Sequence, residues 1–174
     1  MPCTSDHAKS QPRRENVLRA CFSPRADGDR LHVSFAQCFK AHLGLRLRAD
    51  EAQRCIRRIF AACSCSWNPK LLELNCENWS LIEGKLSELA AALTIIACRP
   101  LTPRLVAAAL GISGQERARW TKDGRLPHSG QVVVRRGSPL SIPTYSVEAI
   151  QNLAAHPEIV IAWRKRDIGV RARA

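Results

Sequence analysis

Polar and basic side chains recur at helical spacing between Ser113 and Gly124. Gln115, Arg119 and Lys122 share one face if this stretch is an α-helix, and Glu116 stands beside them. Arginine and lysine donate hydrogen bonds to guanine edges, and glutamine pairs with adenine. The pattern therefore indicates a helix whose outer face can read the major groove of duplex DNA, with Trp120 anchoring the opposite side.

Two short helices joined by a tight turn are expected to carry this face. Thr102 is a cap, with Pro103 at the first helical position, and Gly111 is a natural stop for that first helix. Ser113 caps the second helix, and Gly124 ends it because glycine accepts left-handed backbone angles. Such a pair is a helix-turn-helix.

A period-two pattern rich in β-branched residues follows these helices. Residues 131–136 and 141–145 are expected to pair as a hairpin through a turn at 137–139, with Arg135 and Arg136 projecting from the tip. Beyond the hairpin we expect two more helices, capped by Ser146 and opened by Pro157. The last contains the basic run 164–166, which either contacts phosphates or is simply solvated.

Several short motifs in this region occur in a fixed register. They are Leu110-Gly111-Ile112-Ser113, Trp120, Gly124-Arg125-Leu126-Pro127 and Tyr145-Ser146-Val147-Glu148-Ala149-Ile150. With them, residues 101–153 resemble the winged helix-turn-helix family that includes excisionases, MerR-type regulators and the DNA-binding domain of small phage terminase subunits. Arg117 and Thr121 depart from the family pattern, which commonly has apolar residues at these places, and Glu116 replaces a usual small hydroxyl residue.

The resemblance implies a surface that binds double-stranded DNA. The residues that match the groove-reading positions of the family are Gln115, Glu116 and Arg119. Lys122 and Arg125 match positions near phosphate, and the wing carries Arg135 and Arg136.

The charge of the chain favours a polyanionic partner. The 174 residues include 27 Lys and Arg against 15 Asp and Glu, a net charge of +12. Residues 99–174 hold 13 of these basic side chains and only 5 of the acidic ones. Aromatic residues make up 5% of the chain, too few for a stacking surface for single strands, so duplex DNA is the expected partner.

The first part of the chain is expected to be a flexible arm, residues 1–30, followed by a helical domain, residues 31–99. In that domain we expect helices from Ser34 to Gly44, from Asp50 to Cys63, through Leu71–Leu74 and from Ser80 to Ala97. The last has an apolar seam at spacings of three and four, formed by Trp79 and the residues from Ile82 to Ile96. It is either a core helix or the interface of a homodimer.

Eight cysteines are expected to be reduced, because no secretion signal precedes them. The candidate metal-ligand sets have irregular spacing, so we expect no metal and no cofactor; they are Cys55, Cys63, Cys65 and Cys76, or Cys21, His32, Cys38 and His42. No glycine-rich phosphate loop, paired carboxylates or Ser/His/Asp set indicates an enzyme, and Cys63 with Cys65 is the one redox or nucleophilic alternative.

The expected fold is mainly α, with the helical domain followed by a winged helix-turn-helix and its small β-hairpin over residues 100–174. The expected function is sequence-specific binding of duplex DNA, as a transcriptional regulator or a mobile-element accessory factor in the cytoplasm. The alternative is a non-enzymatic protein-interaction or assembly subunit of a nucleoprotein complex that uses the winged fold as a scaffold. No membrane is expected as a partner, because the longest apolar run, residues 89–98, is about half the length of a spanning helix.

Overall fold

The computed structural model describes residues 23–27, 30–63, 65–68, 71–75, 79–136 and 138–171. These residues are mainly helical and form two antiparallel sheets. The chain divides into two units, Met1–Cys98 and Arg99–Ala174, each with one of the sheets. We describe each unit by itself.

The first unit contains a four-stranded sheet. Its strands are β1 (Ser23–Asp27), β2 (Arg30–Ser34), β3 (Cys65–Asn68) and β4 (Leu71–Asn75), in the order β1-β2-β4-β3 with every neighbour antiparallel. Leu31 and Val33 are buried while His32 between them is partly exposed, so β2 turns alternate residues toward the core. Val33 stands opposite Leu72, which is also buried.

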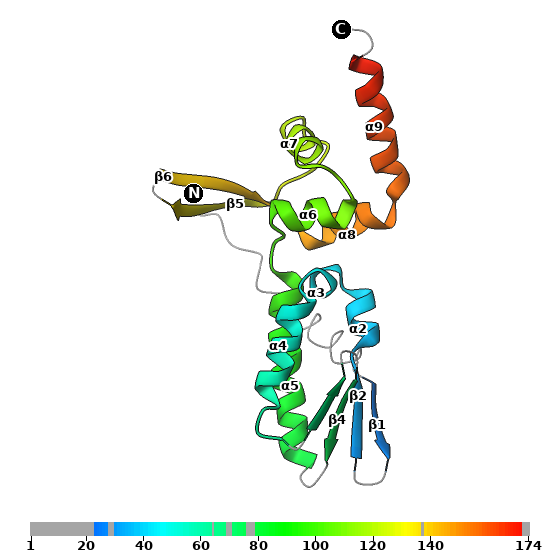
Figure 1. Ribbon diagram of the computed structural model, residues 1–174, viewed down its shortest axis with the longest axis vertical. Coiled ribbons are helices and arrows are strands. Elements are labelled where there is room, and N and C mark those ends of the chain that lie inside the picture. Colours follow the sequence, from blue (N-terminus) through cyan, green and yellow to red (C-terminus); the bar gives the residue numbers. More distant parts are fainter. Residues whose placement is uncertain are drawn as a thin grey trace, which may run out of the picture. The chain divides into compact units, whose positions relative to one another are not determined.

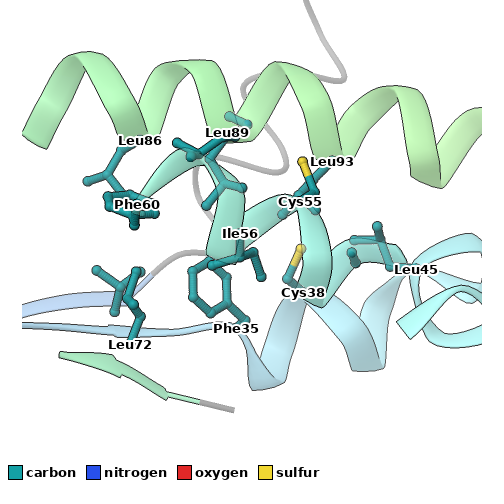
Figure 2. Packing of buried hydrophobic residues seen from close by; sticks show 14 of the residues in the cluster. Phe35, Cys38, Leu45, Cys55, Ile56, Phe60, Leu72, Leu86, Leu89 and Leu93 are labelled. Atoms are coloured by element: carbon teal, nitrogen blue, oxygen red, sulfur yellow. The ribbon is translucent and has the colours of Figure 1, made fainter. Parts of the chain in front are cut away.

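The described residues of this unit also form the helices α2 (Ala36–Ala41), α3 (Leu43–Leu47), α4 (Ala49–Ile59) and α5 (Trp79–Cys98). The long helices α4 and α5 lie side by side (Figure 1). Buried residues of α4 recur every three or four positions, as expected for a helix with one face against a core. Figure 2 shows this core between the strands and α5, where it includes Phe35, Ile56, Phe60, Leu72, Leu89 and Leu93.

The sheet corrects the expectation of a purely helical first domain. Residues 71–74 form a strand and not a short helix, because a short apolar run fits both periods and pairing with β2 decides between them. Strand β1 lies in the stretch 1–30 that we expected to be a loose arm. The remainder of that stretch is outside the described residues, apart from Arg30 in β2.

Gly44 lies inside a helix, where the sequence had indicated a helix end. It is buried in α3, and a Cβ atom there would collide with the backbone of Ala97 in α5. Arg48, just after α3, donates from Nη1 to the carbonyl oxygen of Ile96 at 3.2 Å. Because Gly44 has no side chain, α3 can approach α5 closely, and the hydrogen bond from Arg48 stabilises this contact.

The apolar seam of α5 is part of the core of its own unit. The five seam residues whose side chains the structure describes are buried and belong to the core cluster, so this folded unit does not offer them to a second copy of the chain; they are Ile82, Leu86, Leu89, Leu93 and Ile96. Among the side chains of α5 that the structure describes, the large apolar ones that are exposed are Leu81 and Ile95.

The second unit follows the element order that its caps and glycines predicted. Its elements are α6 (Pro103–Leu110), α7 (Gly114–Lys122), β5 (Gly130–Arg136), β6 (Ser138–Thr144), α8 (Val147–Ala155) and α9 (Pro157–Arg171). Strands β5 and β6 pair antiparallel over seven positions each, with Arg136 opposite Ser138, so the paired strands are longer than we expected. Leu101 and Tyr145 exchange two backbone hydrogen bonds, which ties the entrance of α6 to the end of the hairpin.

Candidate nucleic-acid interface

Helix α7 is fixed at both ends by local interactions. The Ser113 side chain accepts from the Glu116 backbone N–H, and the Glu116 carboxylate accepts from the Ser113 N–H, a complete capping box. Gly111 before it has a φ of 60°, the left-handed conformation that glycine tolerates best. Trp120 is fully buried, and its carbonyl accepts from the Leu126 N–H at 2.8 Å. The orientation of α7 about its axis is therefore set by Trp120.

The outer face of α7 carries polar side chains and one small side chain. Gln115, Ala118 and Lys122 are exposed, and the Arg119 side chain is 35% exposed. Three of these four were predicted to share this face. Ala118 lies among them, and its short side chain leaves room for close approach of a ligand to the helix. A periodic pattern of polar residues does not single out an exposed alanine, so the sequence analysis missed it.

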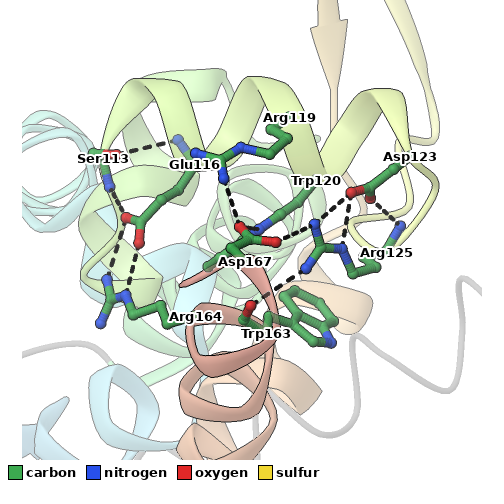
Figure 3. A network of polar contacts seen from close by, with 9 residues as sticks. All are labelled: Ser113, Glu116, Arg119, Trp120, Asp123, Arg125, Trp163, Arg164 and Asp167. Carbon is green, nitrogen blue, oxygen red and sulfur yellow. Dashed lines mark hydrogen bonds and ion pairs between the residues drawn. The ribbon is translucent and has the colours of Figure 1, made fainter. Parts of the chain in front are cut away.

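Asp167 of α9 is the centre of a polar network against the inner side of α7 (Figure 3). Its Oδ2 accepts from Trp120 Nε1 at 2.9 Å and from Arg119 Nη1 at 2.8 Å. Its Oδ1 accepts from Arg125 Nη2 at 2.8 Å. These donors, Trp120 first and Arg125 next, lower the pKa of the Asp167 carboxyl, so Asp167 is a carboxylate at neutral pH.

Glu116 is bound by the same helix α9. Arg164 donates from Nε to Glu116 Oε1 at 2.7 Å, and its Nη2 also reaches the carbonyl oxygen of Gly111 at 2.7 Å. The hydrogen bond from Arg164 and the one from the Ser113 N–H lower the pKa of Glu116 to about 2. Both carboxylate oxygens accept hydrogen bonds inside the unit, so Glu116 holds α7 and α9 together.

Arg125 is also engaged within the unit. It donates to Asp123 and Asp167, its Nη1 lies 3.5 Å from the carbonyl oxygen of Trp163, and its guanidinium carbon stands 5.6 Å from the ring centre of Trp120. Its side chain is only 17% exposed. The indole rings of Trp120 and Trp163 meet edge to face, with their centroids 5.1 Å apart. Arg125 thus joins the loop after α7 to α9.

Tyr145 is the hydrogen-bond partner of Arg117 and Thr121, the two positions where the resemblance had led us to expect apolar residues. The tyrosine is fully buried, and its hydroxyl accepts from Arg117 Nη1 at 2.9 Å and lies 2.8 Å from Thr121 Oγ1. A buried hydroxyl needs hydrogen-bond partners, and apolar residues at 117 and 121 would leave it without them. Arg117 and Thr121 are therefore matched to Tyr145 within the fold.

The hairpin contributes one basic side chain whose position the structure describes. Arg135 is exposed near the tip of β5. Arg136 ends the same strand opposite Ser138, and its side chain lies outside the described part of the structure. One face of the hairpin is apolar and exposes Val132 and Leu140.

The basic run of α9 divides into two kinds of residue. Arg164 is bound to Glu116, whereas Lys165 and Arg166 are exposed. Asp167 was not among the residues predicted to have a role. It stands three residues after Arg164 and four after Trp163, a spacing that places all three on neighbouring parts of one helix face. An acidic residue directly after a run of basic residues is the sequence feature from which a role for Asp167 could have been predicted.

The described residues contain no group of three or more His, Cys, Asp or Glu side chains that could hold a metal ion. Cys38 and Cys55 are buried in the core of the first unit, as expected for thiols that pack as small apolar groups, while Cys65 has no described side chain and Cys21 and Cys76 lie outside the described residues. Within the same residues no helix is both long and apolar enough to span a bilayer.

Comparison of the chain with protein-family models, with curated proteins and with solved structures found no match.

Proposed function

We propose that residues 99–174 bind double-stranded DNA in a sequence-specific manner through a winged helix-turn-helix, with α7 in the major groove and the β5–β6 hairpin as the wing. The observation that carries this proposal is the outer face of α7. It offers the donors of Gln115, Arg119 and Lys122 beside the small Ala118, and the nearby carboxylates of Glu116 and Asp167 are bound by arginines of the same unit, Arg119 among them. A transcriptional regulator or a mobile-element accessory factor would use such a surface.

The distribution of charge supports the same proposal. Residues 99–174 contain five acidic side chains, and three of them, Glu116, Asp123 and Asp167, are bound by arginines of the same unit. Lys122 on α7 and Arg135 on β5 are exposed. A surface that keeps its cations exposed and its anions paired attracts phosphates, and each neutralised phosphate releases counterions.

The structure changes how we assign the individual contacts. Glu116 and Arg125 have their charged groups occupied in the contact between α7 and α9, so we give them a supporting role. We assign base contacts to Gln115 and Arg119. Lys122 and Arg135 then serve as phosphate contacts, which position the protein without reading sequence.

Salt-dependent binding to duplex DNA tests the proposal. We expect Lys122→Ala and Arg135→Ala each to weaken binding to all duplexes alike and to reduce the slope of log K against log salt by about 1. Lys40→Ala removes the same charge from an exposed position on α2 of the first unit, and it should leave both quantities unchanged. Failure of the wild-type chain to retard any duplex at about 150 mM salt would refute the proposal.

The exposed apolar face of the hairpin favours one other function. Val132 and Leu140 are 53% and 61% exposed, which suits a protein contact better than a phosphate contact. On this reading the second unit is a non-enzymatic scaffold in a nucleoprotein assembly. Val132→Ser combined with Leu140→Ser would then abolish assembly with the partner protein, whereas it should leave binding to isolated duplexes intact if α7 is the DNA-contacting element.

A further inference from the structure

We propose that Arg119 reads the major-groove edge of one guanine and that Asp167 is the residue that positions it for this contact. The inference rests on the proposed function and makes it specific, since it names the base and the atoms. The Arg119 guanidinium already donates one hydrogen bond within the unit.

The guanidinium of Arg119 has one edge occupied and one edge open. Asp167 Oδ2 accepts from Nη1 at 2.8 Å. Among the residues that the structure describes, none accepts a hydrogen bond from Nε or Nη2 of Arg119. A guanidinium is planar, and its Nε–H and one Nη2–H point in parallel from the edge opposite to the bound Nη1–H. Arg119 therefore keeps a two-donor fork while it is anchored by its third nitrogen.

This fork matches guanine among the four bases. In the major groove guanine presents two acceptors side by side, O6 and N7, and accepts two parallel N–H donors. Adenine has a donor at N6 next to its N7 acceptor, so one arm of the fork would face another donor. The pyrimidines each offer at most one acceptor there, the O4 of thymine. The geometry of the free edge thus selects a G·C pair.

Asp167 is suited to position Arg119 because it is itself held firmly. Its carboxylate accepts from Trp120 Nε1 and Arg125 Nη2, and its side chain is only 14% exposed. Trp120 is fully buried, so the carboxylate is fixed relative to α7. A long side chain ordered before it meets its ligand loses less freedom on binding, which favours the correct base over its competitors.

The charge of Asp167 acts in the same direction. A lone arginine on the outer face of α7 would be drawn to any phosphate, as we propose for Lys122. A carboxylate 2.8 Å from Nη1 offsets much of that attraction but leaves the hydrogen-bonding fork intact. We therefore expect Arg119 to contribute mainly to base preference and Lys122 mainly to overall affinity.

The test replaces single atoms of guanine. Duplexes bound by the full chain are first selected from a random pool, and each guanine of the selected site is then replaced by 7-deazaguanine, which lacks the N7 acceptor. At one guanine we expect a loss of about tenfold in affinity. Inosine at the same position keeps O6 and N7 and lacks only the minor-groove amino group, so it should bind nearly as well as guanine.

Protein variants then connect the effect to the two residues. Arg119→Ala should bind guanine and 7-deazaguanine equally. Arg119→Lys keeps the charge and the salt dependence but lacks the rigid two-donor fork, so it should retain only part of the discrimination. Asp167→Asn should reduce the tenfold discrimination to about threefold or less, with its fold checked by circular dichroism. Lys122→Ala, the matched change on the same helix face, should lose overall affinity but keep the full discrimination.

Different results would overturn different claims. A chain that retards no duplex refutes the proposed function and this inference with it. A chain that binds a selected site whose guanines all tolerate 7-deazaguanine, or that keeps the discrimination in Arg119→Ala, refutes the inference alone. Unchanged discrimination in a well-folded Asp167→Asn variant would remove the positioning role of Asp167.

Discussion

Replacement of Gly44 by alanine would force apart two helices of the first unit. A Cβ atom added at Gly44 would lie 2.9 Å from the carbonyl carbon of Ala97 and closer still to the carbonyl oxygen. Carbon atoms pack at about 3.5–4.0 Å, so α3 and α5 would have to separate by about 0.6 Å or more. The obstructing atoms belong to the backbone of a 20-residue helix and cannot rotate aside as a side chain can.

The cost is the sum of two unfavourable contributions and one favourable contribution. Overpacking of this kind costs about 1–3 kcal/mol. Separation would also stretch the bond from Arg48 Nη1 to the Ile96 carbonyl, now 3.2 Å, and a buried hydrogen bond to a charged group contributes about 1.5–3 kcal/mol. Alanine recovers about 1 kcal/mol in helix propensity. We therefore expect Gly44→Ala to lower the free energy of unfolding by about 1.5–5 kcal/mol.

The matched control is Gly84→Ala in α5. Gly84 is an exposed residue inside the same helix, and an added Cβ atom there meets nothing within 4 Å. The free energy of unfolding of this variant should rise by up to about 1 kcal/mol, because alanine favours the helix more than glycine does. Urea unfolding of the full chain, followed by circular dichroism, measures both changes, and hydrogen exchange in α3 and α5 localises them. If Gly44→Ala proved as stable as Gly84→Ala, the close approach of α3 to α5 would be refuted.

Two further predictions concern the second unit. The folded-state pKa of Glu116, about 2, lies below its ordinary 4.5, so its ionised form stabilises the unit above pH 4.5 and this contribution is lost as the pH falls toward 2. Glu116→Gln should flatten that part of the acid-unfolding curve measured by tryptophan fluorescence, and an unchanged curve would contradict the pairing with Arg164. Tyr145→Phe should cost about 1–3 kcal/mol in urea unfolding, because Arg117 and Thr121 lose a buried partner. Its effect should be less than additive with that of Thr121→Val, and full additivity would argue against a shared hydrogen bond.

Local signals in the sequence were sufficient to predict the elements of the second unit. Proline at the start of α6, the capping box of α7 and the left-handed glycine at position 111 all act through contacts within a few residues, so they can be recognised without knowledge of the fold. The exposure of Gln115 and Lys122 followed from the same helical periodicity once Trp120 was assigned to the core.

Contacts between distant residues decided the rest. The run of leucines at 71–74 suits a helix or a strand, and only its pairing with residues 30–34 makes it β4. Gly44 was predicted to end a helix from its local sequence. Its actual role depends on α5, because the backbone of Ala97, more than fifty residues later, occupies the space that a side chain at position 44 would need. The binding of Arg119 to Asp167 joins residues 48 positions apart. No periodicity on α7 could reveal that pairing, because Asp167 comes close to Arg119 only when α9 packs against Trp120.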